Sequence, residues 1–224
     1  MRNGPVVELA VIDLAGTTVR DDGAVEAALV EALQVVGAAG DDPDEELLRF
    51  LRGTMGMSKI AVFRDLLRDE ALARTANSAF EQAYARSVES GQVSALPGSE
   101  ETLRMLRENG VRVALTTGFS TATRELLVDT LGWADLIDLA LSPDGDLRGR
   151  PAPDLVLMSL VRLRIDDVRA VAVVGDTAND LLAGHRAGAS LLVGVLTGAH
   201  GRAELAAAPH THLLDSIGEL PEVI

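Results

Sequence analysis

The sequence predicts an α/β fold, a doubly wound parallel sheet of the Rossmann-like type that carries an inserted helical block. Short β-branched runs alternate with helical segments of about ten residues along most of the chain, which is the pattern of a parallel sheet. Residues 21–91 interrupt this pattern with an Ala-, Leu-, Glu- and Arg-rich stretch of helical period. We therefore expect one core domain, formed by residues 1–20 and 92–224, and one helical domain, formed by residues 21–91.

The core elements follow from the hydrophobic pattern and from the turn residues between segments. Residues 6–12 are largely apolar and β-branched, which is typical of a buried parallel strand. Further strands are expected at 111–115, 136–141, 169–174 and 191–195, with 211–214 as an edge strand. Helices are expected between them at 99–109, 121–131, 153–163 and 179–187.

The inserted block is predicted to contain four helices. Their periodic segments run over 24–37, 44–52, 58–69 and 76–90. Breaks are expected where glycine, proline or polar residues gather, at 37–43, 53–56 and 74–77.

Composition limits the partners of the protein. The chain has 224 residues and a formal net charge of −14, so nucleic acid and anionic membranes are not expected to bind it. It has no cysteine, which excludes disulfides and thiolate metal sites. Residues 1–5 are too short and polar to lead a signal peptide, and no apolar run approaches 18 residues. We expect a soluble cytoplasmic protein.

Polar side chains follow three of the predicted strands. Asp13 follows the first strand, Thr116 and Thr117 end the strand at 111–115, and Asp176 follows the strand at 169–174, with Asp180 four residues later. Each residue alone has an ordinary explanation as a cap or turn residue. Ligands of open parallel sheets bind at the carboxyl ends of the strands, so these side chains are expected to lie together. Carboxylate oxygens without histidine or cysteine beside them suit Mg²⁺, which lets a dianionic phosphoryl group enter an acidic pocket.

These residues, in this order, resemble the motifs of the haloacid dehalogenase superfamily over essentially the full chain. The loop 13–18 resembles the nucleophile motif of the family, and the block at 21–91 lies where the family carries its helical cap. The other motifs are matched by Thr117, by Arg150 as the loop cation of the third motif, and by Asp176 with Asp180.

The resemblance implies a mechanism in which an aspartyl phosphate forms and is then hydrolysed by water. Asp13 is the implied nucleophile. The implied Mg²⁺ ligands are Asp13, the backbone carbonyl of Ala15, Asp176 and Asp180. The implied phosphoryl-binding groups are Thr17, Thr117, the Gly118 backbone and Arg150. The implied partner is a small organophosphonate or phosphate ester, and relatives of this kind also form a homodimer through the cap.

Two departures from the usual phosphatase pattern belong together. Most phosphatases of the superfamily carry an acid two residues after the nucleophile, to protonate the leaving alkoxide, and this position is Ala15 here. Lys59 is the only lysine among twenty basic residues, and it lies in a Met-Gly-x-x-Lys segment that begins at Met55. This combination resembles the phosphonatase branch, in which a cap lysine forms a Schiff base with an aldehyde and a neutral enamine departs without a proton donor. Met55 is expected at the seam between cap and core, or in the substrate pocket.

Other positions depart from the phosphonatase pattern. Val62 stands where that branch has a histidine, and Phe119 where it has a tyrosine. One alternative is therefore a phosphomonoesterase of the same fold, in which Lys59 only binds substrate. A non-catalytic binding protein on this scaffold is a third interpretation, which the retained motif residues disfavour. The four histidines are expected at the surface: His185, His200, His210 and His212.

Overall fold

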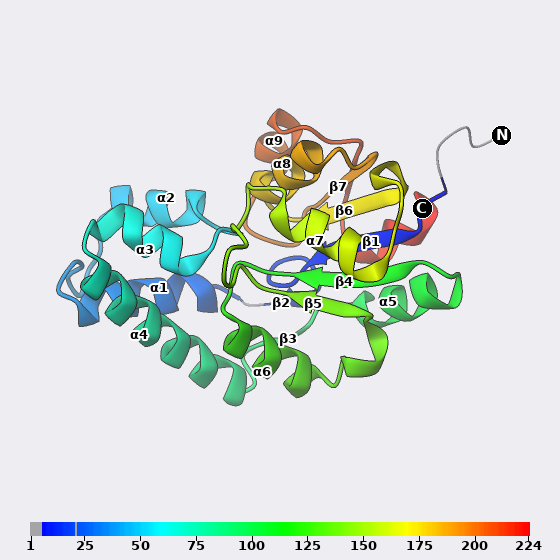
Figure 1. The fold of residues 1–224 in the computed structure, drawn as a ribbon. Helices are drawn as coiled ribbons and strands as arrows, with labels where there is room; N and C mark the ends of the chain where they lie inside the picture. The colour runs from blue at the N-terminus through cyan, green and yellow to red at the C-terminus, as the bar shows by residue number, and fades with distance from the viewer. Residues whose placement is uncertain (1–5, 21) are drawn as a thin grey trace.

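A six-stranded parallel sheet forms the centre of the protein (Figure 1). The structure is a computed structural model, and it describes residues 6–20 and 22–224. The strand order is β5-β4-β1-β6-β7-β8, and every neighbouring pair is parallel. The strands are β1 (Leu9–Asp13), β4 (Arg112–Thr116), β5 (Leu139–Leu141), β6 (Val171–Gly175), β7 (Leu191–Val195) and β8 (His212–Leu214).

Helices cover both faces of this sheet, which confirms the doubly wound prediction. Alternate residues of β1 point to opposite faces. Ala10 and Ile12 pack in one hydrophobic cluster, and Leu9 and Val11 pack in the other. The first cluster includes side chains of α5 (Ser99–Glu108) and α6 (Thr121–Leu131), and the second includes side chains of α7 (Asp154–Leu163), α8 (Ala178–Ala187) and α9 (Arg202–Ala207).

Four further helices form a block at one side of the sheet (Figure 1). They are α1 (Ala24–Val35), α2 (Glu45–Gly53), α3 (Lys59–Leu67) and α4 (Glu70–Glu89). Their contact with the core is partly aromatic. Phe119, from the loop after β4, lies with its ring centroid 4.7 Å from that of Tyr84 and 6.1 Å from that of Phe80, both on α4. Apolar burial therefore joins the block to the core.

One predicted break within this block is wrong. The sequence predicts an interruption at 74–77, but α4 runs through these residues without a break. The chain breaks earlier, at Arg68, which has a left-handed φ of 52° and ends α3. Asp69 then caps α4 by accepting hydrogen bonds from the backbone of Ala71 and Leu72. The hydroxyl of Thr75 bonds back to the Ala71 carbonyl, so this polar residue is accommodated inside the helix.

A small antiparallel sheet, which the sequence analysis does not predict, joins the core to the block. It pairs β2 (Val19–Arg20) with β3 (Ser94–Ala95), just before and just after the four helices. Two-residue strands are too short to show an alternating pattern. The segment predicted as a strand at 136–141 also differs, because a 3₁₀ turn at Ala134–Leu136 precedes the short β5.

Two predictions fall wholly or partly outside the described residues. The polar N-terminal residues 1–5 lie outside them, and so does residue 21, the predicted first residue of the helical domain. Among the helices of the described part, none combines the length and the apolar character needed to cross a membrane.

Candidate active site

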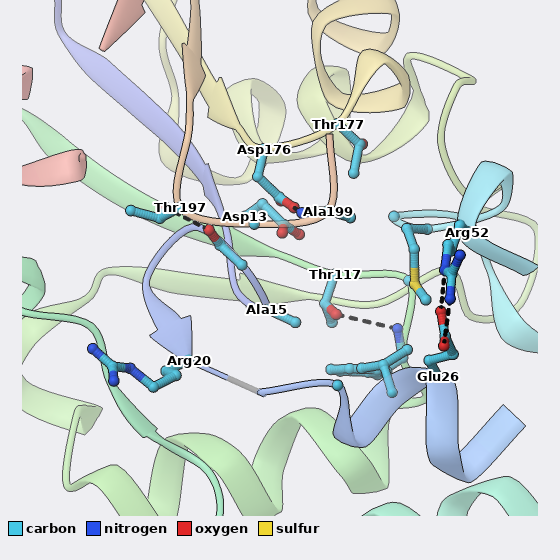
Figure 2. Close-up of a pocket in the computed structure, with 18 of the residues that line it drawn as sticks. Asp13, Ala15, Arg20, Glu26, Arg52, Thr117, Asp176, Thr177, Thr197 and Ala199 are labelled. Carbon is cyan, nitrogen blue, oxygen red and sulfur yellow. Dashed lines mark hydrogen bonds and ion pairs between the residues drawn. The ribbon is translucent and has the colours of Figure 1, made fainter. Parts of the chain in front are cut away.

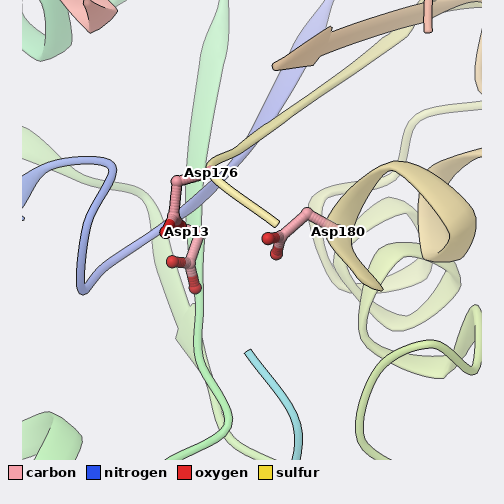
Figure 3. A group of neighbouring side chains, drawn as sticks. All are labelled: Asp13, Asp176 and Asp180. Carbon is pink, nitrogen blue, oxygen red and sulfur yellow. The ribbon is translucent and has the colours of Figure 1, made fainter. Parts of the chain in front are cut away.

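Three buried carboxylates meet where the central strands end. Asp13 is the last residue of β1, and its register partner Thr116 is the last residue of β4. Asp176 follows the last residue of β6, and Asp180 lies in the first turn of α8. One carboxylate oxygen from each aspartate lies within 4.8 Å of the others, and Figure 3 shows the three side chains converging.

Asp180 is oriented by the start of its own helix. Its Oδ2 accepts hydrogen bonds from the backbone N–H of Thr177 at 3.0 Å and from the Thr177 hydroxyl at 2.5 Å. The backbone N–H of Asp180 donates to the Thr177 hydroxyl oxygen at 3.4 Å, which completes a capping box. Gly175 makes room for this carboxyl group, because a Cβ at that position would lie 2.2 Å from the Asp180 Cγ. The other oxygen, Oδ1, is left to face Arg150.

Arg150 is buried among these acids. Its Nη1 lies 2.5 Å from Asp13 Oδ1 and 2.8 Å from Asp180 Oδ1. Its Nη2 donates to the Thr116 hydroxyl at 2.7 Å. Thr116, which the matched motifs do not include, therefore helps to hold the guanidinium against Asp13.

Asp176 is held by groups that sequence analysis assigned elsewhere or missed. The resemblance implies that Thr17 binds a phosphoryl group, but its buried hydroxyl donates to Asp176 Oδ1 at 3.0 Å. Oδ2 accepts from the backbone N–H of Ala199 at 2.7 Å, in the loop after β7. A Cβ at Gly198 would lie 2.0 Å from that oxygen, so glycine is required for the approach. The sequence held one indication of this contact: the loop follows a predicted parallel strand, so it lies at the same edge of the sheet as the carboxylates.

The charge balance of this cluster favours a bound divalent cation. Burial raises the pKa of Asp13 to about 6; the charge of Arg150 opposes this shift and that of Asp180 adds to it. Burial, with the charges of Asp13 and Asp180, also raises the pKa of Asp176 well above its ordinary value. When all three carboxylates are ionised, one guanidinium leaves two negative charges in the buried site, which a hard divalent ion such as Mg²⁺ would neutralise. The all-oxygen donor set therefore fits Mg²⁺.

A cavity of about 380 Å³ lies between these strand ends and the helical block (Figure 2). The core contributes Asp13, Ala15, Thr117, Gly118 and Asp176 to its lining, and the block contributes Met55 and Lys59. Arg150, Asp180 and Thr17 are not among the lining residues and are buried. At the rim, Arg52 holds Glu26 in a two-point ion pair, drawn in Figure 2, with N–O distances of 2.7 and 3.2 Å.

Lys59 begins α3, as the sequence predicts. Only 5% of its surface is exposed, and its Nζ lies 5.7 Å from the centroid of the Phe119 ring. Its backbone N–H donates to the Gly118 carbonyl at 3.2 Å, which ties the start of the helix to the loop after β4. Val62, which stands where the phosphonatase branch has a histidine, is buried one turn further along α3.

The surface prediction for the histidines holds for His185 and His210, which are exposed. It fails for His212, which is half-buried on the edge strand β8, and for His200. This residue is half-buried, and its Nδ1 accepts a hydrogen bond of 3.0 Å from the backbone N–H of Ala178. It satisfies a donor at the start of α8, next to the carboxylate cluster.

The comparisons with known proteins agree with this geometry. "Probable phosphatase IndB" of Dickeya dadantii is 30% identical over 218 residues, covering 95% of this chain and 91% of that protein. A phosphonoacetaldehyde hydrolase of Bordetella pertussis is 29% identical over 263 residues, covering 97% and 91%.

Solved structures show the same fold. A hydrolase from Pseudomonas syringae superposes with a TM-score of 0.84 at 24% identity, covering 96% of this chain and 97% of that one. A phosphonoacetaldehyde hydrolase-like protein from Oleispira antarctica gives 0.81 at 22% identity, covering 98% and 92%. The family model for haloacid dehalogenase-like hydrolases matches residues 7–188. With its carboxylates at the strand ends and its helical block after β1, this chain belongs to the haloacid dehalogenase-like hydrolases.

Proposed function

We propose that this hydrolase cleaves the C–P bond of phosphonoacetaldehyde or of a related carbonyl phosphonate. One observation carries the proposal: Lys59 and Ala15 line the same cavity as Asp13. The cavity thus holds an amine that can form an imine, while the position of the usual proton donor carries a methyl group. Relatives named phosphonoacetaldehyde hydrolase, at about 29% identity, support the same reaction.

The reaction begins with Lys59. Its neutral amine adds to the substrate carbonyl, and the adduct takes up one proton from solvent and loses water, giving a protonated imine on Nζ. A carboxylate oxygen of Asp13 attacks phosphorus, the C–P bond breaks, and its electron pair forms the enamine double bond while the imine nitrogen becomes neutral. Because this leaving group departs neutral, no acid is needed at Ala15.

Two hydrolyses complete the cycle. The enamine carbon takes a proton, and water releases acetaldehyde, or the corresponding carbonyl product, from Lys59. A second water cleaves the aspartyl phosphate, which returns Asp13 and releases phosphate. Thr117 accepts a hydrogen bond from the Phe119 N–H at 3.2 Å, so its own proton is available for a phosphoryl oxygen in the cavity.

Mg²⁺ would be held by Asp13, Asp176 and Asp180 together with the Ala15 carbonyl, and it would supply positive charge to the phosphoryl group during transfer. Arg150 is proposed to hold Asp13 in place for its attack on phosphorus, because the Arg150 Nη1 lies 2.5 Å from Asp13 Oδ1. Both assignments are consistent with the buried ion pairs described above.

The test compares phosphate release from phosphonoacetaldehyde by the wild type and by Lys59→Arg, with Mg²⁺ present. Arginine keeps the charge but cannot form an imine, so release should fall to background. Borohydride added during turnover should attach the two-carbon unit to Lys59 in the wild type alone. Equal release by both proteins would overturn the proposal.

A second candidate is a phosphomonoesterase, and one observation favours it. The alignment with the Bordetella protein spans 263 residues while covering 97% of this 224-residue chain, so that relative has additional residues inside the aligned region. The alignment with the protein named a probable phosphatase spans only 218 residues for similar coverage. A phosphomonoesterase would hydrolyse phosphate esters with Lys59→Arg little impaired.

A further inference from the structure

The segment that leads into Lys59 lies directly on the turn from β6 into α8, which carries two of the site carboxylates and is called the carboxylate loop here. Asn179, between Asp176 and Asp180, is half-buried, and its Nδ2 donates to the backbone carbonyl of Met55 at 2.9 Å. Met55 lies four residues before Lys59, in a stretch without helix or strand structure that ends at the first residue of α3. The Asn179 amide therefore joins the carboxylate loop to the segment that delivers the amine.

The remaining contacts of this segment depend on glycine. A Cβ at Gly56 would lie 2.7 Å from the Thr177 hydroxyl oxygen, and a Cβ at Gly118 would lie 2.1 Å from the Met57 carbonyl oxygen. A Cβ at Gly149, next to Arg150, would lie 2.8 Å from the Cβ of Ser58. Residues 55–59 thus pack closely against three loops, those after β4 and β6 and the one before α7, with no room for a side chain at the glycines between them. We call this stretch the docking segment.

Helix capping does not account for the Asn179 contact. The first turn of α8 is already capped by Thr177 and Asp180, which satisfy each other reciprocally. The Asn179 side chain instead leaves its helix and bonds a carbonyl that lies far away in the sequence. The effect of this bond is therefore on the docking segment.

We propose that Asn179 is a positioning residue that holds the docking segment, and with it the Lys59 amine, in register with the carboxylate cluster. The assignment of Lys59 as the reacting amine rests on the proposed function; the docking itself does not. Loss of one neutral hydrogen bond should increase the open population of the segment by about fivefold.

The single lysine gives a direct measurement of docking. Trinitrobenzenesulfonate modifies accessible amines, and mass spectrometry of the Lys59 peptide gives the rate at this one side chain. In Asn179→Ala the rate should rise by about fivefold over the wild type. Asn109→Ala is the matched control, because Asn109 also donates to a methionine carbonyl, that of Met105 at 3.0 Å, at the end of α5. Its rate should equal that of the wild type.

Asn179→Asp keeps the shape of the side chain but loses the donor, and it covers the case in which Asn179→Ala does not fold. It should also be labelled faster than the wild type. Wild-type labelling rates in a folded Asn179 variant, with melting curves as the check on folding, would overturn the positioning role.

Activity separates this proposal from the function proposed above. With phosphonoacetaldehyde, kcat of the Asn179 variants should fall with little change in KM, because an amine that is held less precisely reacts more slowly while the phosphoryl site stays intact. If the wild type does not cleave this substrate, the proposed function fails, yet the labelling result still decides whether Asn179 docks the segment. Unchanged kcat together with faster labelling would show that docking does not position a reacting amine.

Discussion

Asp13 and Arg150 illustrate how a buried charge is kept ready for chemistry. Burial raises the pKa of the Asp13 carboxyl to about 6, although the charge of Arg150 beside it lowers that pKa. Arg150 cannot lose its proton, so it supplies a fixed counter-charge. Asp180 and Asp176 add repulsion that one guanidinium cannot balance. The free protein therefore stores an electrostatic penalty that a divalent ion relieves.

This penalty predicts a pH-dependent effect of Mg²⁺ on thermal stability. Because the folded-state pKa of Asp13 is raised above 3.8, its contribution destabilises the metal-free fold above about pH 6 and fades as pH falls toward 4. Mg²⁺ competes with that proton. At 100 times its Kd, Mg²⁺ should raise Tm by about 5 °C or more at pH 7.5 and much less near pH 5.

Calorimetry with and without Mg²⁺ at the two pH values measures this difference. Asp176→Asn, which removes one of the three carboxylates, is the control and should lose most of the shift. An equal rise in Tm at both pH values would contradict the assignment of the ion to this cluster.

Ala15 allows a prediction of gained activity. It faces the cavity two residues after Asp13, so Ala15→Asp would place a carboxyl group where a leaving alkoxide departs. Hydrolysis of alkyl phosphates should rise by about 100-fold, the lower end of the usual contribution of a general acid. Turnover of p-nitrophenyl phosphate, whose leaving group needs little protonation, should change far less. A similar change with both esters would show that the new carboxyl group does not act as the acid.

At the scale of elements, α8 is fixed by a close approach to the sheet. Gly184 lies in the middle of this helix, where a Cβ would meet Leu192 at 2.7 Å and Val173 at 2.8 Å. Val173 belongs to β6, the strand that leads to Asp176. The missing side chain lets the helix that carries Asp180 sit directly on the strand that precedes Asp176.

Two opposing effects decide the outcome of Gly184→Ala. Alanine gains about 0.8–1.0 kcal/mol of helix propensity, but overpacking a core costs about 1–3 kcal/mol. Overpacking should win, so the free energy of unfolding should fall by about 1 kcal/mol in urea titrations. Gly53→Ala is the matched control, since a Cβ at the end of α2 meets nothing within 4 Å and should stabilise the protein slightly. Stabilisation by both substitutions would contradict the close packing of α8.

At the scale of the whole molecule, the helical block and the sheet share one hydrophobic cluster. Buried residues of α1 and α4, such as Leu29 and Phe80, belong to the same cluster as Ile12 of β1 and Leu115 of β4. The cluster on the other sheet face contains no residue of the four helices among the described residues. The block is thus an extension of one side of the core.

The sequence predicted the position of a side chain best where that residue directly follows or ends a recognisable strand. Asp13, Thr116 and Asp176 could be placed at one edge because parallel strands end together. The hydrogen bond from Thr17 to Asp176 and the approach of Ala199 could not be predicted, because both depend on the packing of separate loops. The helix predicted at 58–69 ends near Arg68, but the start of α4 at Glu70 was not predicted, because the turn between the helices rests on a left-handed Arg68 rather than on a glycine or proline.

The position of β1 also determines the order in which the protein can fold. This strand pairs with β4 and β6. The first of these partners to be synthesised, β4, follows the entire four-helix block in the chain. Contacts within the block join neighbouring segments of chain, and such local contacts form faster than pairings that close long loops. Asp13 ends one of the two central strands and is synthesised early, yet the carboxylate cluster can assemble only after β6 and the start of α8 have been synthesised. The site is therefore among the last parts of the molecule to become complete.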